Sequence, residues 1–313
     1  ANVVLSWSFS TQSTEDSLRI LGQTVPAQAI AVQATGLTTK QVDARLAGKA
    51  NVFVGTTAVP YYLAKPANAN DKTFLTSFWV AGGPPPLPLD QTSRFITRFN
   101  PVPVNRGTTT IPLLVTVPNA TANAAGGGCT KPAAGWPVAI VQHGLGGDRT
   151  NAFFMADQFA DACFIVASFD LPMHGITNTA SPLYQAANER TFNVDLQNNT
   201  TGASTPDGKI DNSGVHSIPT LLSNPLGGRD ILRQGQADVS VVAKSLTRLD
   251  ITGDAVADVD PTRVHYVGLS LGGIAGVAQA KYAPGIRTVT VAAPGGVLTR
   301  ILRESPSFAP TVN

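Results

Sequence analysis

The sequence predicts an α/β fold, a mostly parallel β-sheet with helices on both of its faces. Short apolar runs, typical of strands buried on both sides, occur at residues 138–141, 164–167, 264–267 and 286–291. Stretches with helical spacing of apolar residues lie between them, at residues 151–162, 229–246 and 271–280. Strands that alternate with helices in this way form parallel sheets, because the helix carries the chain back to the start of the next strand.

The first part of the chain carries shorter signals. We expect strands at residues 3–9, 29–32, 51–55 and 108–117, and short helices that begin near residues 14 and 38, the second ending at Gly48. The proline-rich residues 82–88 predict a loop or a stiff polyproline segment, because proline cannot donate to a β-ladder. We therefore expect an N-terminal extension with the first strands at residues 1–107. The core follows at residues 108–313, with a long insertion at residues 176–225.

Composition excludes some classes of function. Only 13% of the residues are charged and the net charge is +2, with no basic block, so nucleic acid has no electrostatic attraction to this chain. No apolar run reaches the roughly 18 residues that span a bilayer. A weakly charged chain rich in Asn and Thr is typical of proteins exported from the bacterial cell. The signal peptide is expected to be absent from this chain.

Cys129 and Cys163 each precede a predicted strand, at residues 138–141 and 164–167. Neighbouring parallel strands begin at the same edge of a sheet, so the two sulfurs are expected to meet there. Export favours a disulfide between them. The alternative is a pair of unrelated buried thiols.

The pattern G-x-S-x-G occurs at residues 268–272, between a predicted strand and a predicted helix. This context is the one that a sharp nucleophile turn requires, with Gly268 and Gly272 where side chains would clash. We therefore predict Ser270 as a nucleophile that projects from the C-terminal edge of the sheet.

A second motif, HGLGG at residues 143–147, directly follows another predicted strand. Acyl transfer creates an oxyanion that needs preorganised hydrogen-bond donors. The amide after the nucleophile, at Leu271, is one expected donor, and Leu145 is the expected second donor, with Gly144 as the alternative. We expect His143 to orient this loop.

The segments HGLGG, DLPMHG at residues 170–175 and GLSLGG at residues 268–273 resemble the lipase and esterase branch of the α/β-hydrolase superfamily. More narrowly, the chain resembles the bacterial extracellular and virulence-factor lipase family. That likeness includes LSWSFSTQS at residues 5–13, PYYLAKP at 60–66, IPLLVTVPN at 111–119, GRDILRQ at 228–234 and SPSFAP at 305–310. The resemblance implies an α/β-hydrolase fold, with lipase, esterase or lysophospholipase activity in an exported protein.

Other polar residues offer weaker signals. Residues 207–214 and the aspartates at 250, 254, 258 and 260 faintly resemble calcium loops, but neither has the spacing and closing Glu of such a loop. Turn formation is the favoured explanation. The sequence thus predicts no metal and no cofactor.

The remaining triad members are not evident. Such enzymes place an acid and then a histidine after the nucleophile, but no histidine and only Glu304 follow Ser270. We expect the catalytic Asp or Glu, the histidine and the last strands of the sheet in polypeptide C-terminal to Asn313, or in a second chain from the same gene. The alternative is an internal base, His174 or His216.

The sequence thus predicts a carboxylic-ester hydrolase that works through an acyl-enzyme on Ser270. Leu145, Met173 and Leu271 predict an apolar lining, suited to esters of lipids, lysophospholipids or polyesters. An acyltransferase and a catalytically inactive binding scaffold are the alternatives.

Overall fold

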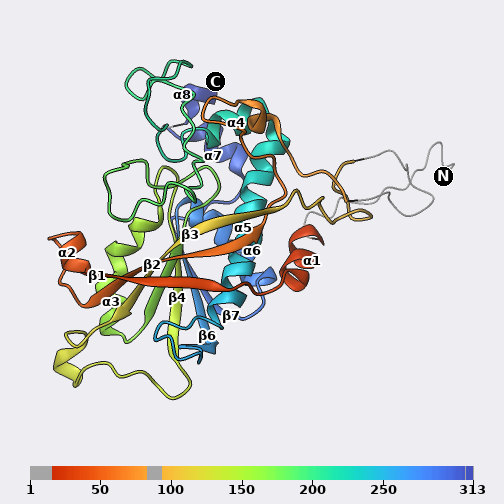
Figure 1. Ribbon diagram of the computed structural model, residues 1–313. Coiled ribbons are helices and arrows are strands. Elements are labelled where there is room, and N and C mark those ends of the chain that lie inside the picture. The colour runs from red at the N-terminus through yellow and green to blue at the C-terminus, as the bar shows by residue number, and fades with distance from the viewer. Residues whose placement is uncertain (1–15, 83–93, 307, 313) are drawn as a thin grey trace, which may run out of the picture.

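The computed structural model describes residues 16–82, 94–306 and 308–312, so the strand predicted at residues 3–9 lies outside it. Its centre is one seven-stranded sheet in the order β1-β2-β3-β5-β4-β6-β7 (Figure 1). The strands are β1 (Ile30–Thr38), β2 (Ala50–Pro60), β3 (Thr108–Pro118), β4 (Trp136–Gln142), β5 (Ile165–Phe169), β6 (Val259–Leu269) and β7 (Ile286–Ala292).

The sheet is mixed, which corrects the expectation of a mostly parallel sheet. Strands β5, β4, β6 and β7 run parallel to one another. Strands β1, β2 and β3 pair antiparallel, and β3 joins the two parts of the sheet by running antiparallel to β5. Parallel neighbours need a long crossover, usually a helix. In the described part of the chain, only the four-residue α2 (Thr39–Val42) lies between β1 and β2 and only η1 (Thr73–Thr76) lies between β2 and β3, and the parallel pairs are those of β4, β5, β6 and β7.

Helices cover both faces, as expected. Figure 1 shows α3 on one side of the sheet and α1, α5 and α6 on the other. The α-helices are α1 (Asp16–Thr24), α2 (Thr39–Val42), α3 (Phe153–Asp161), α4 (Ser217–Ser223), α5 (Pro225–Leu246), α6 (Leu271–Tyr282), α7 (Leu298–Glu304) and α8 (Ala309–Val312). Three 3₁₀ turns are η1 (Thr73–Thr76), η2 (Ala124–Gly126) and η3 (Arg149–Ala152). Within the part that the structure describes, no helix has both the length and the apolar character needed to cross a bilayer.

Two helix boundaries differ from the prediction. Helix α5 begins at Pro225 instead of residue 229, because the Asn224 side chain accepts a hydrogen bond from the Gly227 amide and proline suits the first helical turn. Helix α2 ends at Val42 instead of Gly48. The chain then turns so that the Ala47 and Lys49 amides donate to the buried Asp157 carboxylate.

Cys129 and Cys163 form a disulfide, with their Cα atoms 5.4 Å apart, as the sequence predicts. Cys163 lies just before β5, and Cys129 precedes the parallel neighbour β4. The bridge therefore sits near the beginnings of these strands, whereas the predicted nucleophile Ser270 follows the end of β6.

Candidate active site

Ser270 occupies a sharp turn between β6 and α6. Its φ is +49°, a left-handed conformation that is strained for a residue with a side chain. A Cβ on Gly268 would lie 2.3 Å from the Gly272 carbonyl oxygen, and one on Gly272 would lie 2.5 Å from that of Gln142. The turn therefore requires both glycines, and it leaves the Ser270 residue exposed.

The HGLGG loop after β4 lies directly against this turn. A Cβ on Gly144 would lie 3.0 Å from the Ser270 Cβ, and the Gly272 amide donates to the His143 carbonyl over 3.1 Å. Within the described residues, the amides of Leu145 and Leu271 make no backbone hydrogen bond outside regular elements. Leu271 directly follows Ser270, and Leu145 directly follows Gly144, which lies against Ser270, so both amides are candidate donors at this site.

His143 holds the HGLGG loop in place through two hydrogen bonds. Its Nε2 accepts the Leu171 amide over 3.0 Å, so the proton resides on Nδ1, which lies 2.8 Å from the Gly144 carbonyl oxygen and donates to it. Burial lowers the pKa of His143 to about 4, which keeps the ring neutral. These contacts are those of a residue that orients the loop.

A buried cluster of charged side chains lies next to the HGLGG loop. The Arg149 guanidinium donates to both oxygens of Glu189, at 2.6 and 2.9 Å, and to Asp170. The Arg149 amide also donates to Asp170, over 2.6 Å. All three side chains are at most 1% exposed. Burial raises the pKa of Asp170, and the adjacent guanidinium opposes that rise.

This cluster was not predicted from the sequence. Asp170 belongs to the DLPMHG motif, but nothing in the local pattern pairs it with Arg149 or with Glu189 in the insertion. The only available signal was the presence of charges in a chain with 13% charged residues. The cluster ties the loop after β4, the loop after β5 and the insertion to one another.

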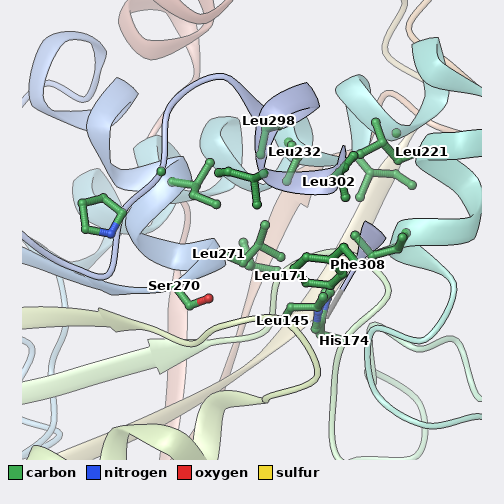
Figure 2. Close-up of a pocket in the computed structure, with 18 of the residues that line it drawn as sticks. Leu145, Leu171, His174, Leu221, Leu232, Ser270, Leu271, Leu298, Leu302 and Phe308 are labelled. Atoms are coloured by element: carbon green, nitrogen blue, oxygen red, sulfur yellow. The ribbon is translucent and has the colours of Figure 1, made fainter. Parts of the chain in front are cut away.

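An apolar pocket opens beside Ser270. It has a volume of about 300 Å³, and Figure 2 shows the Ser270 hydroxyl at its edge. Its walls come from α4, α5, α6 and α7, from the loops after β5 and β7, and from Leu145 of the HGLGG loop. Prominent lining residues are Leu145, Leu171, Leu232, Leu271, Leu302 and Phe308.

Leu145 and Leu271 line the pocket as predicted, but Met173 does not. The chain has a left-handed conformation at Met173, with φ of +67°, and the side chain packs with Phe74, Val194 and Leu196 instead. Met173 therefore belongs to the core under the insertion.

All four histidines lie in described segments, and none makes a hydrogen bond with Ser270. His174 reaches the pocket, but its Nδ1 donates to the Pro172 carbonyl over 2.9 Å. Burial lowers its pKa to about 3. His216 contacts Asp211 at 2.6 Å, and His265 contacts Thr288 at 2.7 Å.

The acidic side chains that the sequence singled out lie elsewhere. Glu304 is 62% exposed and pairs with Arg300 along α7, whereas the neighbouring Leu302 faces the pocket. In the faint calcium-loop segment, Asp211 accepts the amides of Leu196 and Gln197. Across the described ranges, no three His, Cys, Asp or Glu residues gather in a way that holds a metal.

No protein-family model and no curated protein sequence matches this chain. Among solved structures, it is similar to an acetyl xylan esterase from Paenibacillus sp. R4, with 14% identity and a TM-score of 0.45 over 97% of this chain and 67% of the other. It is also similar to acetyl xylan esterase 1 from Thermoanaerobacterium sp. JW/SL YS485, with 13% identity and a TM-score of 0.39 over 88% and 56%. The chain thus spans from just over half to two thirds of these enzymes.

Proposed function

We propose that this protein is a carboxylic-ester hydrolase that acts through an acyl-enzyme on Ser270. The observation that carries the proposal is the exposed serine in a left-handed turn, at the edge of an apolar pocket and beside two available amides. An idle serine has no need of such a strained turn. The same geometry supports the α/β-hydrolase assignment made from the motifs.

The reaction follows from these positions. The Ser270 Oγ attacks the ester carbonyl carbon, and the amides of Leu145 and Leu271 donate to the oxygen that becomes negatively charged. The alcohol then leaves with a proton, and water hydrolyses the acyl-serine in a second step. His143 holds the loop that carries Leu145, so it acts as a positioning residue.

We further propose that the base is a histidine outside these 313 residues, in a C-terminal segment or a second chain from the same gene. The hydrogen bonds of His143, His174, His216 and His265 to other groups support this. Activity of the longer gene product, together with weak or absent activity of this chain, is the expected result. Full activity of this chain, lost on His174→Gln or His216→Gln, would show that the base is internal.

The pocket supports an apolar acyl group as the substrate. Its volume of about 300 Å³ equals roughly ten water-sized groups, at about 30 Å³ each. A medium-length acyl chain is of this size, which favours lipid, lysophospholipid or polyester substrates. The Cys129–Cys163 disulfide supports an exported protein, because disulfides persist in oxidising compartments.

A fluorophosphonate probe tests the nucleophile. We expect the probe to label Ser270 in the full gene product, and Ser270→Ala to abolish the label. Ser217 is a matched control, because it lines the same pocket without a strained turn, and Ser217→Ala should retain the label. Labelling at another residue, or none in the full product, contradicts the proposal and favours a binding scaffold. Product analysis with added alcohol separates hydrolysis from acyl transfer.

A further inference from the structure

Exposed apolar side chains gather in one short segment between β2 and β3. Phe95, Phe99, Val102 and Val104 are 58%, 46%, 43% and 39% exposed, and all lie within residues 95–104. We call residues 78–82 and 94–106 the arm. Figure 1 shows it projecting from the body of the molecule. Clustered exposed apolar residues, unlike scattered ones, mark an interaction surface.

Isolated antiparallel bridges hold the arm together, with residues 80–82 between the two segments they pair with. The Ala81 amide donates to the Arg94 carbonyl over 2.8 Å, and the Gly82 amide donates to Val102 over 2.7 Å. Bridges also pair Val80 with Phe95 and Ala81 with Pro103. This register determines which side chains share a face, because directly opposed residues in antiparallel strands point the same way.

The two faces of the arm are both apolar. Trp79, Ala81 and Ile96 are at most 8% exposed and form the inner face. Alternation along the strands then places Val80, Phe95, Val102 and Val104 on the outer face. An antiparallel sheet with one solvated face normally carries polar residues there. An apolar outer face therefore indicates a partner that removes it from water.

The described residues of the arm carry positive charges and no acidic side chain. Arg94, Arg98 and Arg106 are exposed, and residues 94–107 contain no acidic residue. Among the described residues, no ion pair involves these three arginines. At the turn, the Arg98 guanidinium lies 4.6 Å from the centre of the exposed Phe99 ring. Aromatic groups next to arginines suit the boundary between acyl chains and anionic headgroups.

The arm is attached to the wall of the pocket. The Trp79 amide donates to the buried Asp230 carboxylate of α5 over 2.9 Å. Just before the arm, the Leu75 carbonyl accepts the Asn224 side-chain amide at 3.1 Å. Helix α5 also contributes Ile231 and Leu232 to the pocket. Any surface to which the arm binds therefore lies close to the pocket beside Ser270.

We propose that the arm is an interfacial anchor that binds the surface of an anionic lipid bilayer. Phe95, Phe99, Val102 and Val104 enter the headgroup region, and the three arginines pair with lipid phosphates. Binding requires neither the Ser270 hydroxyl nor ester cleavage, so it stands or falls apart from the proposed hydrolysis.

Vesicle co-sedimentation tests the anchor. We expect the chain to bind vesicles of phosphatidylcholine with phosphatidylglycerol, and to bind pure phosphatidylcholine vesicles much less. Phe99→Ser should weaken binding roughly tenfold, because an interfacial aromatic group is lost. Arg98→Gln should weaken binding to the anionic vesicles about fivefold, the effect of one cation near such a surface. Phe154→Ser is the matched control, since Phe154 on α3 is 64% exposed and should leave binding unchanged.

A second measurement reports insertion directly. In Phe99→Trp the new indole should shift its emission to the blue when anionic vesicles are added, whereas the indole of Phe154→Trp should not. No binding, no preference for anionic lipid, or an equal loss in Phe154→Ser would overturn the proposal. Self-association without lipid that Phe99→Ser abolishes, together with no vesicle binding, would instead assign the arm to a contact between two copies.

Discussion

The support of the HGLGG loop and the wall of the pocket, which meet at Ser270, are built by opposite means. On one side, the HGLGG loop is held by His143 and by the buried cluster of Arg149, Asp170 and Glu189. On the other side, the pocket is lined mostly by leucine, isoleucine and proline. Charged groups in the interior demand defined partners at defined distances. Apolar walls demand only volume. The polar side is therefore suited to positioning a loop, and the apolar side to accepting apolar groups of different sizes.

Arg149→Met is expected to have the largest effect, because it breaks the polar side. The substitution leaves the buried carboxylates of Asp170 and Glu189 without their cation. Removal of one partner from such a cluster costs about 3–5 kcal/mol of unfolding free energy. Urea denaturation measures the loss. Arg45→Met, at an arginine that is 80% exposed, is the control and should leave the midpoint nearly unchanged. Similar midpoints for the two variants would mean that the cluster contributes little.

Loss of the disulfide sharpens the comparison, because the disulfide lies away from both sides of Ser270. Cys129→Ser with Cys163→Ser removes a bridge between residues 34 apart in sequence. The unfolded chain gains entropy, so the free energy of unfolding should fall by about 3–4 kcal/mol. Probe labelling of Ser270 should be unaffected below the new melting temperature. The labelling rate of Ser270 can be measured in this double variant and in Arg149→Met. If it falls equally in both, the whole sheet, and not the buried cluster alone, positions the site.

Acid should destabilise the fold through its two buried histidines, His143 and His174. The folded-state pKa values of His143 and His174 are lowered to about 4 and about 3, below an ordinary value of about 6.5. The unfolded chain therefore binds protons first as the pH falls, so these groups stabilise the fold fully above about pH 6.5 and lose that contribution towards pH 4. Between pH 7 and pH 5 we expect about 2 kcal/mol of loss per histidine. Urea titrations at both pH values measure it, and His174→Gln should show a smaller loss than the parent chain.

A pocket substitution is expected to have the smallest effect on stability. Leu298→Trp adds volume to the apolar wall, at the start of α7, a helix of only seven residues. We expect a change of about 1 kcal/mol or less in unfolding free energy. In the full gene product, KM for long-chain p-nitrophenyl esters should rise about tenfold more than KM for the acetate ester, since one buried group contributes about 1–3 kcal/mol of discrimination. An equal change for both esters would show that the acyl chain does not enter this pocket.

Local sequence was sufficient for the parts of the site that short segments define. The strand–turn–helix around Ser270 depends on Gly268 and Gly272, which lie two residues away on either side. The HGLGG loop likewise follows its own strand directly. The pairing of Cys129 with Cys163 followed from the parallel order of two consecutive strands. In each case, the residues that determine the structure are near neighbours in the chain or in the sheet order.

The tertiary structure alone decided the rest. Arg149 pairs with Glu189, 40 residues further along the chain. Met173, predicted to line the pocket, instead packs in a core cluster with Phe74. The antiparallel half of the sheet and the outer face of the arm also depend on pairings between distant segments. Periodicity in a sequence reports which side chains share a face, but not which distant segment that face meets. That choice depends on the packing and hydrogen bonding of the whole chain, because each buried polar or apolar group must find its partner among all the others.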